Sequence, residues 1–257
     1  MEVEHLIVKI ITFALLAVGS VVLLSGCTNT NTTESGSIVH GTSAMVSRSF
    51  QMGDFTELEV GGGSSFTVIF RQSDDPIVNV EMQENLFDLH EISVRSGILS
   101  VARTGNDRII YGNYRPRVYI YAPNLAAINV RGALHAEDWD TIRTQKFSIT
   151  SNGFVDISTH LEVDTLELNL SGMSELEFWG NAYNTTITKN GAGNIIANSL
   201  QTTNTVINLN GAGEVEIAVS STLNATLEGV GNIRYIGNPI VIQYIGRTAI
   251  GSISKVD

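Results

Sequence analysis

The chain has 257 residues, of which 43% are hydrophobic and 16% are charged. This composition excludes a disordered chain and supports a sizeable buried core in one large domain or two smaller ones. Its 15 Lys and Arg against 26 Asp and Glu give a net charge of -11, which repels phosphate backbones and excludes nucleic acid as a partner.

The N-terminus carries a candidate targeting signal. An apolar run over residues 10–24 leads into Leu24-Ser25-Gly26-Cys27, and Cys27 is the only cysteine of the chain. This segment resembles a bacterial lipoprotein signal with its lipobox, which implies cleavage before Cys27, acylation of its thiol and a mature chain anchored by lipid. The alternatives are a signal cut by an ordinary peptidase and an uncleaved membrane anchor.

Two details bear on this signal. Glu2 and Glu4 depart from the basic start that such signals usually have, so the true start codon can lie elsewhere. Thr28 follows the cysteine. In Gram-negative lipoproteins an Asp at that position would favour the inner membrane, so the resemblance implies the outer membrane for this chain, on its periplasmic or its cell-surface face.

We expect three regions along the chain. Residues 1–26 form the signal peptide. Residues 27–48 are polar, with too little apolar content to fold, and are expected to be a flexible tether. Residues 49–257 form the folded domain, with an N-terminal β part over 49–125 and glycine-repeat coils over 126–257.

The N-terminal β part is predicted from alternation of apolar and polar residues, which is typical of strands with one buried face. Turn signals such as Gly61-Gly62-Gly63 separate the strands, and residues 84–91 could make one or two helical turns. The apolar positions are Leu58, Val60, Phe66, Val68, Phe70, Val78, Val80, Met82, Ile98, Leu99, Val101, Val118 and Ile120.

A glycine-centred pattern occurs six times between residues 129 and 235. The clearest copies are ITKNGAGNI at 187–195, INLNGAGEV at 207–215 and ATLEGVGNI at 225–233, and the first glycines are 21, 19, 19, 20 and 18 residues apart. A copy of this length cannot bury its own apolar face, so the copies must stack and share one core. The period predicts an all-β parallel solenoid of coils of about 20 residues, right-handed as parallel β crossovers generally are.

The glycines are expected to form the corners of the coils, where a positive φ would strain any other residue. Three degenerate copies lack the second glycine, so their corners are expected to differ in shape. The corner glycines are Gly132, Gly153, Gly172, Gly191, Gly193, Gly211, Gly213, Gly229 and Gly231.

Together with the lipobox, three features carry a family resemblance: strands at 55–60 and 66–70, a strand and Pro-Asn turn at 118–125, and serial Gly-Ala-Gly corners. Residues 50–250 resemble the putative autotransporter-adhesin head GIN domain family. The resemblance implies a β-helix with Gly-x-Gly turns between sheets, no recognised catalytic residues, and adhesion as the proposed role.

One polar residue per coil follows the corner. If the coils are in register, these residues form a column on the outer face. The hypotheses are a solvated edge, a divalent cation site or an acid pair, with Asp156 and Glu175 as the candidate contact residues. The column comprises His135, Asp156, Glu175, Asn194, Glu214 and Asn232.

Two further clusters could contact a ligand. Tyr119 and Tyr121 lead a group of tyrosines that could stack on sugars or on a partner's side chains, and half-buried strand packing is the alternative. The group comprises Tyr111, Tyr114, Tyr119 and Tyr121 with Arg115 and Arg117 between them. Arg131 and Arg143, with the acids Asp138 and Asp140 and with His135, could imitate a polysaccharide lyase or form a surface ion network.

The sequence predicts a cell-envelope lipoprotein that acts as a non-catalytic adhesion or recognition module. We expect no cofactor, no metal and no catalytic residue, because nucleophile, phosphate-loop and metal motifs are missing from the sequence. Expected partners are the membrane, through the lipid, and a glycan or protein surface. The alternatives are a structural or assembly protein that pairs or oligomerises through its end coils and a pectin-lyase-like carbohydrate-active enzyme.

Overall fold

The structure is a computed structural model that describes residues 37–42, 44–112 and 114–256. They belong to one compact unit, Ser35–Asp257. The predicted signal peptide, Cys27 and residues 27–36 of the predicted tether lie outside the described residues. In the described part of the chain, no helical segment has the length and apolarity that crossing a membrane requires.

The described residues form strands and one short 3₁₀-helix. The elements are β1 (Ile38–His40), β2 (Met45–Gln51), β3 (Glu57–Gly61), β4 (Ser65–Gln72), β5 (Ile77–Gln83), η1 (Glu84–Leu89), β6 (His90–Arg95), β7 (Ile98–Arg103), β8 (Arg108–Ile110), β9 (Arg117–Ala122), β10 (Ala127–Val130), β11 (Ala133–Ala136), β12 (Ile142–Ser151), β13 (Phe154–Leu170), β14 (Met173–Lys189), β15 (Ala192–Leu209), β16 (Ala212–Leu227), β17 (Val230–Ile236), β18 (Ile240–Ile245) and β19 (Ile250–Lys255).

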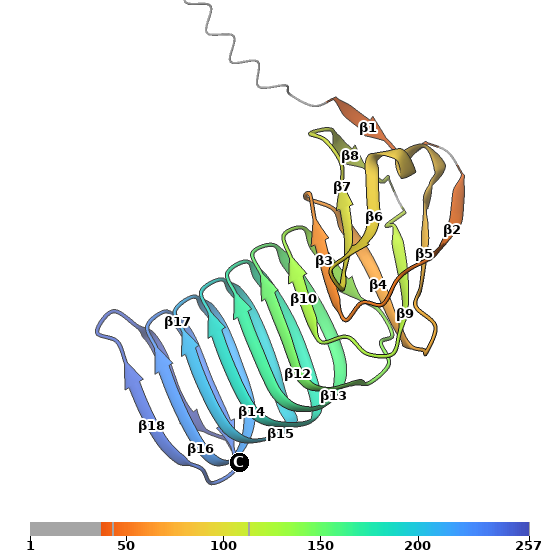
Figure 1. The fold of residues 1–257 in the computed structure, drawn as a ribbon. Coiled ribbons are helices and arrows are strands. Elements are labelled where there is room, and N and C mark those ends of the chain that lie inside the picture. Colours follow the sequence, from red (N-terminus) through yellow and green to blue (C-terminus); the bar gives the residue numbers. More distant parts are fainter. Residues whose placement is uncertain (1–36, 43, 113, 257) are drawn as a thin grey trace, which may run out of the picture. The chain divides into compact units, whose positions relative to one another are not determined.

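The strands stack in parallel as a β-solenoid, which confirms the predicted fold class. Figure 1 shows successive coils from β10 to β18 side by side. Each coil pairs with the next one through residues about 20 positions apart, so the apolar positions of all coils fall into columns inside the stack. One column is Leu99, Leu58, Ile128, Ile149, Leu168, Ile187, Ile207 and Ala225, all buried.

The stack begins earlier than the glycine repeat predicts. β3 and β4 pair in parallel with β10 and β11 and so form a coil of their own. Residues 73–126 are a long insertion between this coil and the next one. Because of the insertion, the coil of β3 and β4 does not follow the 20-residue period of the later coils. β7 and β9 extend the stack by pairing in parallel with β3 and β4.

Antiparallel strands cover the N-terminal end of the stack. β2 pairs with β5, β5 pairs with β9 and β6 pairs with β7, all antiparallel. The helix η1 lies between β5 and β6, where the sequence predicts a helical turn. Antiparallel pairing ends the parallel edge and so caps the solenoid at this end.

The predicted tether is wrong in its C-terminal part. β1 (Ile38–His40) pairs with β8 in parallel, and β2 (Met45–Gln51) pairs with β5. Val39 and Val46 are partly buried and pack against the core. These strands are stabilised by partners 26 to 70 residues away along the chain, so their polar composition alone does not indicate them.

The first glycine of each corner does not have the expected positive φ and is required instead by close backbone contact. A Cβ on Gly211 would lie 1.9 Å from the carbonyl oxygen of Gly191 on the preceding coil. The second glycines differ, because Gly213 also has a φ of +120°. The corresponding residues of the earlier coils, Leu134, Val155 and Ser174, have no positive φ, so those corners have a different shape.

Candidate functional site

The predicted polar column exists on the outer face of the stack. Thr67, His135, Asp156, Glu175 and Asn194 pair in register from β4 to β15. His135 Nδ1 lies 2.6 Å from Asp156 Oδ2, and Asn194 Nδ2 donates to Glu175 Oε2 at 3.3 Å. Neighbouring coils therefore hold one another through side chains as well as through the backbone.

Further along the stack, acidic side chains lie on the same outer face. Glu214 and Glu216 of β16 accept ion pairs from Arg234 at 2.8 and 2.9 Å. Asp156 and Glu175 line a hollow of about 210 Å³ with Glu177 and Ile196. Among the described residues, no group of three or more His, Cys, Asp or Glu side chains is arranged to hold a metal ion. Contact through Asp156 and Glu175 stays a prediction.

A larger cleft opens beside the first column residues. Its volume is about 480 Å³, and β2, β4, β5, β9 and β11 supply most of its walls. The sequence indicates part of this lining, and the topology brings the rest to it from β2, β4, β5 and the residue that follows β11. The lining residues are Met45, Thr67, Glu81, Tyr114, Arg115, Arg117, His135 and Glu137.

Charges of opposite sign are paired inside this cleft. Arg117 Nη2 donates to both carboxylate oxygens of Glu137 at 3.1 and 3.2 Å. The hydrogen bond to Tyr119, followed by the Glu137 carboxylate, raises the pKa of Arg117. The Tyr119 hydroxyl donates to Glu81 Oε2 at 3.3 Å. The cleft therefore holds positive and negative side chains in fixed positions, an arrangement that suits the binding of a polar group.

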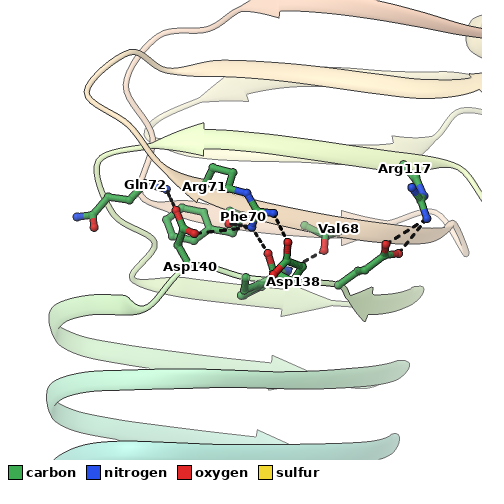
Figure 2. Close-up of polar contacts among 9 residues, drawn as sticks. Val68, Phe70, Arg71, Gln72, Arg117, Asp138 and Asp140 are labelled. Carbon is green, nitrogen blue, oxygen red and sulfur yellow. Dashed lines mark hydrogen bonds and ion pairs between the residues drawn. The ribbon is translucent and has the colours of Figure 1, made fainter.

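Next to the cleft, residues 137–140 are fastened to β4. Figure 2 shows Arg71 between Asp138 and Asp140, and Arg71 forms ion pairs with both carboxylates. The backbone N–H of Gln72 donates to Asp140 Oδ2 at 2.8 Å. Trp139 Nε1 donates to the carbonyl oxygen of Val68 at 2.7 Å. This wall of the cleft is therefore held by several contacts.

Arg131 and Arg143 do not form ion pairs with Asp138 or Asp140. Arg131 forms an ion pair with Glu59. Arg143 pairs with Glu162 at 2.9 Å. The two aspartates pair with Arg71, which lies in the preceding coil and about 70 positions earlier in the sequence, so no local spacing indicates it. These pairs form a surface ion network, the alternative that the sequence leaves open.

The four tyrosines do not share one surface. Tyr119 and Tyr121 lie two residues apart on one face of β9 and are half-buried. Tyr114 is exposed at the cleft. Tyr111 packs inward, and its hydroxyl lies 2.9 Å from His90 Nε2. Burial raises the pKa of Tyr111 to about 12. A role of Tyr119 and Tyr121 in binding stays a prediction.

Comparison with known proteins places the fold. Residues 54–239 match the family model described as "Putative auto-transporter adhesin, head GIN domain". No match is found among curated proteins.

Three solved structures have a similar fold. A putative adhesin from Bacteroides fragilis NCTC 9343 is 19% identical, with a TM-score of 0.76, covering 85% of this chain and 100% of its own. A putative lipid binding protein from Parabacteroides distasonis ATCC 8503 is 20% identical, with a TM-score of 0.60, covering 85% and 99%. A putative adhesin from the same organism is 22% identical, with a TM-score of 0.58 and the same coverage. At these identities the likeness concerns the fold.

Proposed function

Because the chain belongs to the family of putative auto-transporter adhesins with a head GIN domain, we propose that it is a non-catalytic adhesion module of the cell envelope. Its mature form is anchored by a lipid on Cys27, in the outer membrane. The module binds a glycan or protein surface through the outer faces of its sheets and through the charged cleft at Arg117 and Glu137.

The observation that carries this proposal is the filled interior of the stack. The columns from Leu58 to Ala225 are buried over their whole length, so the hollows lie on the outside and are open. In enzymes, by contrast, ligands are mostly enclosed in deep pockets. In the cleft the carboxylate of Glu137 is already paired with Arg117, which favours recognition over proton transfer.

The adhesion role is tested on cells that carry the full-length chain. Bacteria expressing it are expected to adhere to host-cell or matrix-coated surfaces more strongly than bacteria carrying the empty vector. The double variant Arg117→Ala and Glu137→Ala, which empties the cleft of its ion pair, is expected to reduce adhesion at unchanged surface amount. Equal adhesion of expressing and empty-vector cells would contradict the proposed function.

The lipid anchor is tested separately. The full-length chain expressed in a bacterial host is expected to incorporate labelled palmitate and to fractionate with membranes. The variant Cys27→Ser is expected to lose the label and appear in the soluble fraction. Labelling that persists in Cys27→Ser would overturn the anchor without affecting the adhesion role.

A second function is favoured by the last strands. β18 pairs only with β16 and β19 only with β17 among the described residues. Ile240, Ile242 and Ile250 are 73%, 66% and 67% exposed. An apolar strand edge of this kind can pair with a strand of another protein, as an envelope assembly component would. Crosslinking of the full-length chain in cells, compared with Ile242→Lys, is the test.

A further inference from the structure

A short side of the solenoid carries exposed aromatic and amide side chains that lie outside the glycine repeat motif. On β14, Trp179, Asn181 and Tyr183 alternate outward, while Gly180 has a φ of +104° and bends the strand between two of them. We call these residues, with Gln201 of β15, the aromatic strip. Trp179 is 40% exposed and Tyr183 is 58% exposed.

Neighbouring coils extend the aromatic strip in register. Trp179 pairs with His160 on one side, and their rings lie 6.4 Å apart. Asn181 pairs with Glu162 of β13 and Gln201 of β15. Trp179 and Tyr183 are at most about 13 Å apart along the backbone, at about 3.3 Å per residue. A short oligosaccharide spans this distance.

A hollow of about 300 Å³ adjoins Tyr183. Its lining combines an aromatic ring, two amides, a carboxylate and hydroxyl groups. The lining residues are Val163, Asp164, Asn181, Tyr183, Gln201, Thr202, Thr203 and Ser220. Amides, carboxylates and hydroxyls are the groups that exchange hydrogen bonds with sugar hydroxyls, and a tyrosine ring offers an apolar face to the C–H face of a sugar.

The floor of this hollow is fixed by the protein. Residues 198–200 of β15 have no partner on β16, where the register shifts between Ala197 and Gln201. Just after this shift along β15, the buried Thr202 hydroxyl donates to the carbonyl oxygen of Ala218 at 2.7 Å. The same hydroxyl lies 2.8 Å from Thr205 Oγ1. A hollow that is already shaped loses less entropy when a ligand binds.

The polar groups around the hollow are available to a ligand. Within the described residues, the side chains of Asn181, Tyr183 and Gln201 make no hydrogen bond to other protein groups, whereas Asn184, Asn190 and Asn204 on the outer ladders do. The amides therefore have their hydrogen-bonding capacity free on an exposed surface.

The negative charge around the hollow favours neutral over anionic glycans. Glu162 is paired with Arg143, whereas Asp164 lines the hollow without an ion pair among the described residues. The whole chain carries a net charge of -11. Sulfated or sialylated glycans would be repelled from this surface, and neutral glycans would not be.

We propose that the aromatic strip is a binding site for neutral glycans. Tyr183, Asn181 and Gln201 hold one sugar ring in the hollow, and Trp179 stacks on a neighbouring ring. The proposal rests on the adhesion function proposed above and names the class of surface that is recognised. A protein partner would need a larger apolar centre than two rings separated by Asn181.

The test titrates the full-length chain with neutral tetrasaccharides (chitotetraose, cellotetraose, maltotetraose and mannotetraose) and with sialyllactose and tetragalacturonate as anionic probes. Trp139 and Trp179 are the two tryptophans of the chain. At least one neutral probe is expected to shift the tryptophan fluorescence to the blue and to protect it from acrylamide, while the anionic probes leave it unchanged. Trp179→Phe is expected to abolish the shift, because the Trp139 ring is held against β4, where its Nε1 donates to the carbonyl oxygen of Val68.

Variants locate the site. Tyr183→Ala and the double variant Asn181→Ala and Gln201→Ala are each expected to weaken binding about tenfold or more. Because these side chains are exposed, the thermal unfolding midpoint is expected to stay within a few degrees of the native value. Tyr244→Ala is the matched control, since Tyr244 of β18 is exposed to a similar degree (56%) and lies outside both the strip and the charged cleft, and it is expected to bind as the native chain does.

The outcomes separate this inference from the proposed function. If cells expressing the native chain adhere but no neutral probe binds, or if Tyr183→Ala and the double variant Asn181→Ala and Gln201→Ala bind as tightly as the native chain, the glycan site is overturned and the adhesion role stands. If native cells fail to adhere, the adhesion role falls, whatever the titration shows. Binding of the anionic probes alone would also overturn the proposal.

Discussion

The ammonium group of Lys189 lies 2.9 Å from the carbonyl oxygen of Ala212, inside a corner of the solenoid. Lys189 is fully buried, and its register neighbours on the adjacent coils are Leu170 and Leu209. It also donates to the carbonyl oxygen of Gly191 at 3.1 Å. A charged side chain thus occupies a place that the neighbouring coils fill with leucine.

Lys189→Leu is expected to stabilise the protein at neutral pH. Burial lowers the pKa of Lys189, so the native state carries the cost of a buried charge below that pKa. The cost is relieved as the pH rises toward 10.5, because the native state releases the proton before the unfolded state does. We expect about 1 to 3 kcal/mol more stability for Lys189→Leu at pH 7 and a smaller difference at pH 9.5, measured by urea unfolding.

The control for this measurement is Lys146→Leu. Lys146 is 55% exposed and pairs with Glu167, so its replacement is expected to change the free energy of unfolding by under about 1 kcal/mol. A Lys189→Leu variant that is less stable than the native chain at pH 7 would show that the two hydrogen bonds outweigh the burial cost.

His90 is expected to make the fold sensitive to acid. Its Nδ1 lies 2.9 Å from the carbonyl oxygen of Leu86, and burial is the main cause that lowers its pKa. Below pH 6.5, His90 is protonated in the unfolded state but stays neutral in the native state. The free energy of unfolding therefore falls as the pH drops toward the lowered native pKa. His90→Gln is expected to show a weaker loss of stability between pH 7.5 and 5, measured by thermal unfolding. The exposed His40→Gln is the control and should keep the native pH profile.

Gly213→Ala is expected to destabilise the corner by about 3 kcal/mol or more. A Cβ there would lie 1.9 Å from the carbonyl oxygen of Gly193, and the φ of +120° is strained for any other residue. At Gly53 a Cβ meets nothing within 4 Å, so Gly53→Ala is expected to leave stability unchanged or raise it by under about 1 kcal/mol. Equal effects in chemical unfolding would show that the corner does not need glycine.

Trp139→Phe is expected to loosen residues 137–140 more than Arg71→Gln does. Trp139 Nε1 donates to the Val68 carbonyl oxygen at 2.7 Å, and its ring lies 6.1 Å from that of Phe70. The Arg71 partner Asp138 is 82% exposed, so that ion pair contributes at most about 1 kcal/mol. Hydrogen exchange of the amides at 137 and 140, which bond to β4, measures the difference. Faster exchange in Arg71→Gln would reverse the order.

Most of the solenoid fold can be predicted from the glycine period, which is a local feature of the sequence. Asn129, Thr150, Asn169, Thr188 and Asn208 fall into one outward column because strand alternation and the spacing of about 20 residues together define the register. The same reasoning places His135 beside Asp156. These relations need only the pattern within and between adjacent copies.

Partner choice over longer distances comes from the tertiary structure. The coil of β3 and β4 joins the stack across an insertion that interrupts the period, and this brings Arg71 to Asp138 and Asp140. The aromatic strip likewise depends on the bend at Gly180 and on unpaired residues in β15. The sequence by itself determined the repeat and the faces of its strands, because alternation is a local property. Only the tertiary structure decided which charged and aromatic side chains meet, because bulges and insertions shift the register between coils.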